Sequence, residues 1–286
     1  MSINSIDRMY KIIHLLSKKP LSLKEIKATL KLDINDMTIR RDFKNIENDF
    51  GYLIEYNRKE KVYTIEKINN DFFNEKMLDS IAIMSAIKQT ENTRQCIYLE
   101  KRQSSGVEFF SDIIDAIDNK NVLAFTLNSY WNPPTKRKCA PIAIKEAMKR
   151  WYLIGYDLDK KEIRNYGLDR LSNFRILDQK ISPPKVDVNE LYKNAFGIEN
   201  YTMPTEFILK FEISQLKYLK SLPLHHSQEI YDVTDDYFYL KMFVHPAYEL
   251  KMEILKFSDY CEVIEPKSYR KELKATINKL YNKYKV

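Results

Sequence analysis

The chain has 286 residues, of which 44% are hydrophobic and 30% are charged, a composition typical of a folded protein with more than one domain. The net charge of +7 permits a polyanionic partner without requiring one. Cys96, Cys139 and Cys261 are too scattered for a disulfide framework or a zinc site. No signal peptide or membrane-spanning stretch is evident, so we expect a cytoplasmic protein without a metal or cofactor.

Glycine is scarce, which argues against the common nucleotide-binding loops. Such loops need clustered glycines because backbone amides must approach a phosphate closely. The five glycines are instead scattered: Gly51, Gly106, Gly155, Gly167 and Gly197. No GxSxG motif or cluster of His and Cys ligands appears either. We therefore predict that the protein is not an enzyme.

The N-terminal segment has the pattern of three short helices. Residues 7–16 carry apolar side chains at helical spacing: Met9, Ile12, Ile13 and Leu16. Ser22 and Glu25 fit a capping box at the start of the second helix. The third helix is predicted over residues 36–50, with Asn35 as its N-cap and Gly51 as its stop. Its apolar face consists of Ile39, Phe43, Ile46 and Phe50.

A basic hairpin follows the third helix. Residues 53–56 and 62–65 alternate as two strands, and the basic turn 57–61 lies between them. Three helices followed by such a hairpin indicate a winged helix, whose third helix reads the major groove. The predicted DNA-contacting residues are Thr38, Arg40, Arg41, Lys44, Arg58 and Lys59. The alternative is a charged helical bundle whose basic residues serve only solubility.

Two amphipathic helices are expected to connect this segment to the rest of the chain. They cover residues 71–89 and 108–119, and the second carries the apolar residues Phe109, Ile113, Ile114 and Ile117. These apolar stripes fit either packing within the chain or a dimer interface. The sequence leaves both interpretations open.

Short strands dominate the central region. They are predicted over residues 122–127, 139–147, 150–156, 163–167 and 173–176. Turns are predicted over residues 132–136 and 157–161. Five short strands in about 60 residues suggest a small barrel.

The C-terminal region has an α+β pattern. Prolines at Pro183, Pro184 and Pro204 mark its boundaries, and a short helix is expected over residues 188–196. Strands and helices then alternate over residues 207–211, 215–222, 229–233, 237–244, 247–257, 261–264 and 269–284. This βαββαβα order suggests a ferredoxin-like unit. His225 and His226 have no third ligand in the sequence, and we interpret them as surface or hydrogen-bonding residues rather than metal ligands.

Several of these segments resemble one family of transcriptional regulators. Residues 37–43, MTIRRDF, look like the recognition helix of DeoR-like and WYL-associated winged helices. Residues 150–157, RWYLIGYD, contain the tripeptide that names the WYL family. At familiar spacing around it lie Ser129-Tyr130, residues 137–141, 163–166 and 168–171. The C-terminal stretches 223–228 and 261–266 are similar to the extension domain commonly attached to WYL domains.

The resemblance implies a multidomain α+β fold. It consists of a winged helix-turn-helix, a helical linker, a small Sm/SH3-like β-barrel and a ferredoxin-like C-terminal domain. We expect a DNA-binding domain over residues 1–67, a linker over 68–119, a WYL ligand-sensing domain over 120–182, a connector over 183–204 and a C-terminal extension domain over 205–286. The family also implies a homodimer.

A ligand site is implied by the same resemblance. The matching positions are Tyr130, Arg137, Tyr152, Arg164 and Arg170. Guanidinium groups bind phosphate in a bidentate way and tyrosines supply stacking faces, so the implied effector is a nucleotide or oligonucleotide-like molecule. Alternatively, Tyr152 is a core residue, and the two later arginines pair with acids such as Asp169. We expect Trp151 and Leu153 to be core residues.

The function implied is that of a ligand-responsive transcriptional regulator, a repressor, that binds a double-stranded DNA operator. One alternative is an activator of stress or DNA-damage genes triggered by single-stranded nucleic acid. Another is a nucleic-acid-processing enzyme, for which no catalytic constellation is evident. Control of a phage-defence system is a role that similar regulators have.

Overall fold

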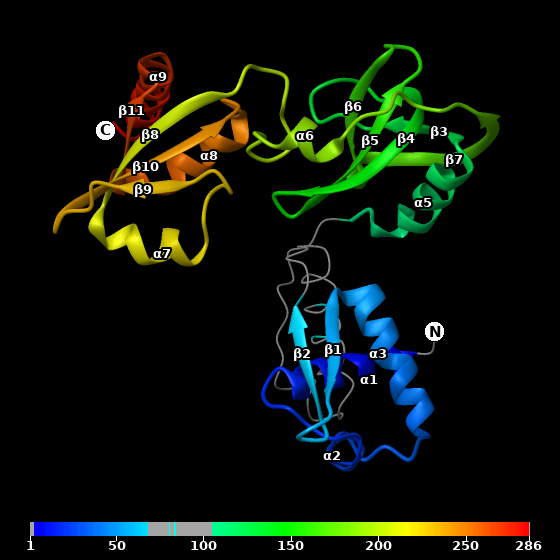
Figure 1. Ribbon diagram of the computed structural model, residues 1–286. Helices are drawn as coiled ribbons and strands as arrows, with labels where there is room; N and C mark the ends of the chain where they lie inside the picture. Colours follow the sequence, from blue (N-terminus) through cyan, green and yellow to red (C-terminus); the bar gives the residue numbers. More distant parts are fainter. Residues whose placement is uncertain (1–2, 68–79, 81–82, 84–104, 286) are drawn as a thin grey trace. The chain divides into compact units, whose positions relative to one another are not determined.

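The computed structural model describes residues 3–67, 80, 83 and 105–285 (Figure 1). The chain divides into two compact units, Met1–Lys101 and Arg102–Val286. Apart from residues 80 and 83, the helix predicted over residues 71–89 lies outside the described residues, as does Cys96. Among the helices of the described part, none has the length and apolar character that crossing a bilayer requires.

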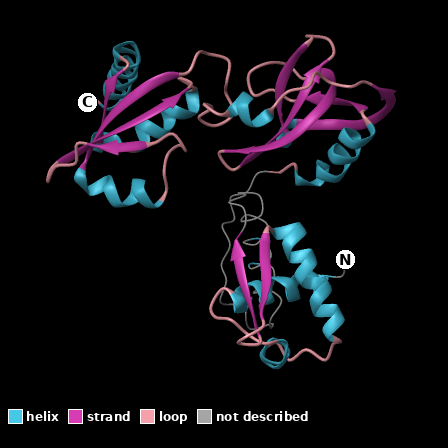
Figure 2. Ribbon diagram, viewed as in Figure 1, coloured by secondary structure: helices cyan, strands magenta, loops and turns pink. Residues whose placement is uncertain are grey.

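Over residues 3–67, the first unit has three helices and a two-stranded hairpin, as predicted. They are α1 (Ile3–Leu16), α2 (Leu23–Thr29), α3 (Asp36–Phe50), β1 (Tyr52–Asn57) and β2 (Val62–Lys67). The two strands pair antiparallel (Figure 2). The predicted apolar stripes meet in one core, whose buried residues include Met9, Ile12, Leu16, Ile26, Ile39, Ile46 and Phe50. This is the arrangement of a winged helix-turn-helix.

Local hydrogen bonds fix the ends of these helices. The capping box at α2 is present: Ser22 N donates to Glu25 Oε2 at 2.7 Å, and Glu25 N donates to Ser22 Oγ at 3.3 Å. At α3, Met37 N donates to Asn35 Oδ1 at 3.0 Å. Gly51 ends α3 with φ of 67°, a left-handed conformation that glycine adopts at little cost. The predicted caps are confirmed.

The second unit contains a five-stranded antiparallel sheet. Its strands are β3 (Asn121–Leu127), β4 (Thr135–Ala147), β5 (Arg150–Asp157), β6 (Glu162–Gly167) and β7 (Leu171–Lys180). They lie in the order β6-β5-β4-β3-β7. Irregularities in the β3–β7 and β4–β5 pairings interrupt the register, and such bulges bend strands. The short 3-10 helix η3 (Leu168–Arg170) joins the two edge strands.

A helix packs against the inner face of this curved sheet (Figure 1). It consists of η2 (Val107–Phe109) and α5 (Phe110–Asn119). Ile113 and Ala116 are fully buried in one cluster with Leu123, Phe125 and Leu153. Packing within the chain is therefore the correct interpretation of this apolar face. Ile114 is 49% exposed, so its expected place on the buried side was wrong.

The connector joins the sheet to the C-terminal region through polar contacts. It contains α6 (Val188–Tyr192). On β6, Asn165 Nδ2 donates to Ile198 O at 3.0 Å, and its Oδ1 accepts a hydrogen bond from the Tyr192 hydroxyl. On the other side, His245 N donates to Asn194 O at 2.9 Å. The connector is thus bound to both neighbours.

The C-terminal region is a four-stranded antiparallel sheet with three helices and two 3-10 turns. Its elements are β8 (Thr205–Glu212), η4 (Ile213–Gln215), α7 (Leu216–Ser221), β9 (Glu229–Tyr231), β10 (Tyr237–Val244), α8 (Tyr248–Lys256), η5 (Ser258–Tyr260), β11 (Cys261–Glu265) and α9 (Lys267–Tyr284). The strand order is β11-β8-β10-β9. Alternate residues of β8 and β10 share one core with apolar side chains of all three helices. This order and this layering agree with the predicted ferredoxin-like unit.

Two predicted boundaries were wrong. Residues 135 and 136 belong to β4 rather than to a turn, because Thr135 and Lys136 pair with Leu127 and Thr126 of β3. The helix over residues 188–196 ends at Tyr192. Its Leu191 carbonyl accepts a hydrogen bond from Asn200 Nδ2 at 3.2 Å, and Asn194 O is taken by the C-terminal domain. These backbone carbonyls thus accept hydrogen bonds from distant residues instead of from a further turn of α6.

Candidate functional site

The exposed side of α3 carries the predicted DNA-contacting cations. Arg40, Arg41 and Lys44 are exposed and Thr38 is half-buried, whereas Ile39 and Ile46 on the other side are fully buried. No carboxylate in the described part of the chain forms a salt bridge with these three cations. The side of α3 that faces away from the core therefore presents these three cations without a salt-bridge partner among the described residues.

A partly buried ion pair fixes α3 to α1. Arg8 Nε donates to Asp42 Oδ2 at 2.6 Å, and Arg8 Nη2 donates to Asp42 Oδ1 at 3.0 Å. The Asp42 side chain is 2% exposed. The hydrogen bonds to this carboxylate raise the pKa of Arg8. Sequence analysis missed the pair, although an acid between Ile39 and Phe43 on an apolar face was a usable signal.

The hairpin is anchored close to its turn, and the turn itself is exposed. Leu21 N donates to Tyr63 O at 3.1 Å, and Tyr63 N donates to Leu21 O at 2.7 Å. At the tip, Asn57 Oδ1 accepts a hydrogen bond from Lys59 N at 3.0 Å, which shapes the turn. Arg58 and Lys59 are exposed. The hairpin therefore presents its predicted cations on a fixed support.

A second group of candidate side chains lies in the five-stranded sheet domain, around Asp169 of η3. Arg150 Nη1, at the start of β5, donates to Tyr130 OH at 3.0 Å and forms an ion pair with Asp169 Oδ2. Tyr130 OH also donates to Asp169 Oδ2, at 3.2 Å. The Arg170 guanidinium lies over the Tyr130 ring, 5.0 Å from its centroid. We call Tyr130, Arg150, Asp169 and Arg170 the arginine cluster.

The arginine cluster has unused hydrogen-bonding capacity. Arg170 Nε is 3.8 Å from Asp169 Oδ1, too far for a hydrogen bond. It is buried and has no hydrogen-bond partner among the described residues. Tyr130 is 62% exposed, so its ring is accessible from solvent. Two guanidinium groups beside an accessible aromatic ring suit a phosphate with an attached base.

Tyr152 lies next to this cluster but is a core residue. It is 8% exposed and packs with Ile154, Tyr192 and Ile198. Burial raises the pKa of the Tyr152 hydroxyl, and the charge of Arg170 acts in the opposite direction. Its hydroxyl is thus close enough to sense the cluster electrostatically.

Arg137 and Arg164 belong to a different part of the domain. Arg164, on β6, forms hydrogen bonds with Glu162. Its charge, like that of Arg137, acts on Asp157 at the end of β5. The structure thus brings together three of the five predicted ligand residues, Tyr130, Tyr152 and Arg170. It adds Arg150 and Asp169, which the sequence-based residue set did not include.

The two histidines of the C-terminal region are hydrogen-bonded. His225 Nδ1 contacts Ser227 Oγ at 2.8 Å, and His226 Nε2 contacts Lys193 O at 2.6 Å. Burial and the neighbouring His226 lower the pKa of His225 to about 4. Within the described residues, no three His, Cys, Asp or Glu side chains are grouped as metal ligands would be.

Comparisons with known families identify the domains. The WYL domain family matches residues 108–176, and the WCX domain family matches residues 203–281. The chain carries a WYL domain followed by a WCX domain. The arginine cluster therefore lies within the WYL domain. Of the residues that name the domain, Leu153 is fully buried, and Trp151 packs edge-on against Phe110 with 4.9 Å between ring centroids.

The solved structures that are similar to the chain include the following two. One is the proteasome accessory factor B/C (PafBC) of Arthrobacter aurescens, with a TM-score of 0.40 and 16% identity over 96% of this chain. The chain spans 46% of the length of that protein. The other is described as a CRISPR Cas-related protein, with a TM-score of 0.42 and 12% identity over 88% of this chain and 74% of that one. No curated protein matches the chain.

Proposed function

We propose that the protein is a ligand-responsive, sequence-specific DNA-binding transcriptional regulator that acts as a repressor. In this proposal the winged helix binds the operator and the WYL domain binds a nucleotide or nucleic-acid-derived effector. A homodimer would place two winged helices on two half-sites. The protein has no enzymatic activity in this proposal.

One observation supports DNA binding above the others. The winged helix holds α3 by its apolar face and by the Arg8–Asp42 pair, and leaves Arg40, Arg41 and Lys44 free of salt bridges in the described part of the chain. A helix that enters the major groove needs such unpaired cations for guanine edges and phosphates. The exposed Arg58 and Lys59 at the hairpin tip provide a second contact to the backbone or minor groove.

The effector site of the proposal is the arginine cluster. Arg150 and Arg170 supply guanidinium donors for a phosphate, and Tyr130 supplies a ring for stacking. Tyr152 supports the cluster from the core. The family resemblance also indicates Arg137 and Arg164. In this proposal they make a separate, secondary contact with the effector.

DNA binding is tested with the fragment upstream of the protein's own gene. We expect selective binding relative to scrambled DNA, with a steep salt dependence. The double variant Arg40→Ala/Arg41→Ala should lose about 1–3 kcal/mol per base-contacting arginine. Lys18→Ala/Lys19→Ala removes the same charge from exposed residues outside α3 and should bind almost as the wild type does. Equal weak binding to both fragments would refute the proposal that the protein binds DNA sequence-specifically.

Effector control is tested separately. The variant Arg150→Ala/Arg170→Ala should bind the operator normally but lose its response to nucleotide or oligonucleotide. An unchanged response in this variant would exclude the cluster as the effector site. A reporter gene should rise when the regulator is deleted, and a fall would identify an activator instead.

A further inference from the structure

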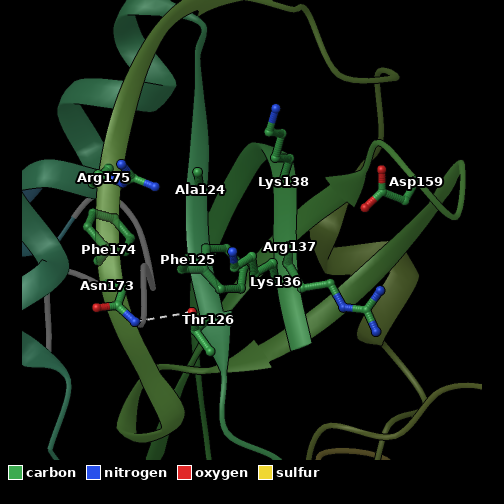
Figure 3. A pocket seen from close by; sticks show the side chains of 10 residues that line it. All are labelled: Ala124, Phe125, Thr126, Lys136, Arg137, Lys138, Asp159, Asn173, Phe174 and Arg175. Carbon is green, nitrogen blue, oxygen red and sulfur yellow. Dashed lines mark hydrogen bonds between the residues drawn. The ribbon is translucent and has the colours of Figure 1, made fainter. Parts of the chain in front are cut away.

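Two pockets of the second unit differ in charge. The pocket on β3, β4 and β7 of the WYL sheet is lined by four cations and one acid (Figure 3). The pocket of the WCX domain has a volume of about 540 Å³ and lies where β8 ends, β10 begins and η5 meets β11. Its charged lining consists of one cation, Lys210, and five acids, Glu212, Asp235, Asp236, Asp259 and Glu262. Because the whole chain has a net charge of +7, this local excess of acids does not follow from the composition.

The acidic pocket lies at one end of an accessible sheet face. Side chains of α7, α8 and α9 pack against the core face of the WCX sheet, which consists of alternate residues such as Leu209 and Leu240. The residues between them point to the other face. There, Tyr239 of β10 pairs with Lys210 of β8 on one side and with Tyr231 of β9 on the other. These three residues are only half-buried, so a partner can reach this face.

Three tyrosines form an aromatic surface on this face. The rings of Tyr231 and Tyr239 stack with 5.7 Å between their centroids, and the rings of Tyr237 and Tyr239 meet edge-on at 5.7 Å. Lys210 Nζ lies over the Tyr237 ring, 4.0 Å from its centroid. The face thus already holds one ammonium group by a cation–π contact. We call Tyr231, Tyr237 and Tyr239, together with the acidic pocket that Tyr237 lines, the tyrosine face.

Most acids of the pocket are not neutralised by the chain itself. Glu262 forms an ion pair with Arg270 Nη2 at 2.6 Å. The other four are exposed, and none forms a salt bridge with a described residue. Within the part of the chain that the structure describes, no three of them are grouped as metal ligands would be. Their mutual repulsion would instead be relieved by cations spread over a larger partner.

Backbone hydrogen bonds fix the walls of the pocket. Thr234 Oγ1 accepts hydrogen bonds from Asp236 N at 3.3 Å and from Tyr237 N at 3.0 Å, which shapes the turn before β10. Ile213 N donates to Asp236 O at 2.9 Å and so joins the end of β8 to this turn. The acids and the tyrosines are therefore held in one arrangement before a partner binds.

We propose that the tyrosine face is a docking surface for a basic peptide segment of another protein. Arginine or lysine side chains of the segment stack on the tyrosine rings, as Lys210 already does within the chain. Neighbouring cations of the segment pair with the unpaired acids, and this charge complementarity selects the partner. The same acids repel phosphates, so the face does not suit a nucleotide. Docking at the tyrosine face is therefore independent of the effector site.

The test measures binding of a fluorescein-labelled hexa-arginine peptide to the full-length protein by fluorescence anisotropy. We expect saturable binding that weakens as the salt concentration rises. The acid variant, Glu212→Gln/Asp235→Asn/Asp236→Asn, removes three unpaired charges and should weaken binding by about 10-fold. The tyrosine variant, Tyr237→Leu/Tyr239→Leu, keeps every charge and should weaken binding by about 5-fold through the loss of cation–π contacts.

A matched control separates this face from general charge. Asp112, Asp115 and Asp118 of α5 are exposed, and Asp112→Asn/Asp115→Asn/Asp118→Asn removes as many negative charges as the acid variant does. This control should bind hexa-arginine as the wild type does. Circular dichroism melts of all variants verify that the fold is intact.

Several outcomes would overturn docking at the tyrosine face. Equal losses in the acid variant and the α5 control, or an unchanged affinity in the tyrosine variant, would reduce the binding to bulk charge attraction. Spermine that displaces hexa-arginine at an equal concentration would identify a polyamine site instead. A lower oligomeric mass of the acid variant, with unchanged affinity for hexa-arginine, would identify an interface between copies of this chain.

Discussion

Arg150 at the start of β5 forms an ion pair with Asp169 in η3, and both residues contact the hydroxyl of Tyr130. Asp169 therefore pairs with the Arg150 guanidinium that we propose as a phosphate donor. A ligand phosphate and this carboxylate compete for the same donor. The acid is thus a built-in competitor as well as a support for the cluster.

Neutralising this competitor should strengthen ligand binding. We expect Asp169→Asn to raise the affinity for a phosphorylated dinucleotide by about 3-fold, since a partly exposed ion pair is worth up to about 1 kcal/mol. Titration calorimetry measures the effect. Asp118→Asn removes the same charge from an exposed position of α5 and should not change the affinity. A loss of affinity in Asp169→Asn would mean that the carboxylate mainly positions the arginines.

Gly167 leaves no room for a side chain beside the cluster. An added Cβ would lie 2.7 Å from Arg170 Nη2 and 2.8 Å from Asp169 Oδ1. The ends of these side chains can move, so we expect Gly167→Ala to fold normally and bind the dinucleotide more weakly. At Gly155 an added Cβ would lie 2.8 Å from the buried Cys139 Sγ, so Gly155→Ala should lower the melting temperature instead. Equal melting losses in both variants would contradict this distinction.

The Arg8–Asp42 pair is expected to stabilise the winged helix strongly. Asp42→Ala leaves the largely buried Arg8 guanidinium without its partner and should cost about 3 kcal/mol in the free energy of unfolding. Urea denaturation of the full-length protein would show this loss in the transition of the first unit. The exposed Lys27–Asp36 pair offers a control on the same helix, because Asp36→Ala should cost less than about 1 kcal/mol. Similar losses in the free energy of unfolding for the two variants would show that burial of the ion pair does not determine its contribution to stability.

His225 should make the stability of the second unit depend on pH. Its folded-state pKa of about 4 lies below the ordinary value of 6.5, so the unfolded chain binds more protons between these values. Stability should therefore rise as pH increases from about 4 to 6.5 and fall on acidification. Melting temperatures of the wild type and His225→Gln across this range test the effect. The difference between the two proteins should vary with pH across this range and become constant above pH 6.5, and a difference independent of pH throughout would disprove the assignment.

Local sequence patterns were sufficient for much of the fold. The capping box at Ser22, the cap at Asn35 and the stop at Gly51 depend on neighbours within a few residues, and all three are present. The five strands of the central sheet, and the order of strands and helices along the C-terminal domain, follow from alternation and turn residues. The end of α6 and the start of β4 depend on tertiary hydrogen bonds and pairing, which no short pattern encodes.

The candidate site was less predictable for the same reason. Tyr130 and Arg170 came from the family resemblance, but Arg150 and Asp169 meet only because η3 lies beside the start of β5. Asp42 was visible in the sequence as an acid on an apolar face, yet its partner Arg8 lies 34 residues away. The tyrosine face depends on the register that places Tyr239 between Lys210 and Tyr231. Such cross-strand relations require the folded sheet.

The connector gives the second unit an unusual mechanical property. Asn165 of the WYL sheet bonds to Ile198 and Tyr192, and Asn194 of the same segment bonds to His245 of the WCX domain. A segment bonded on both sides cannot shift independently of either neighbour. Any displacement of β6 would therefore be transmitted through these hydrogen bonds to the WCX domain.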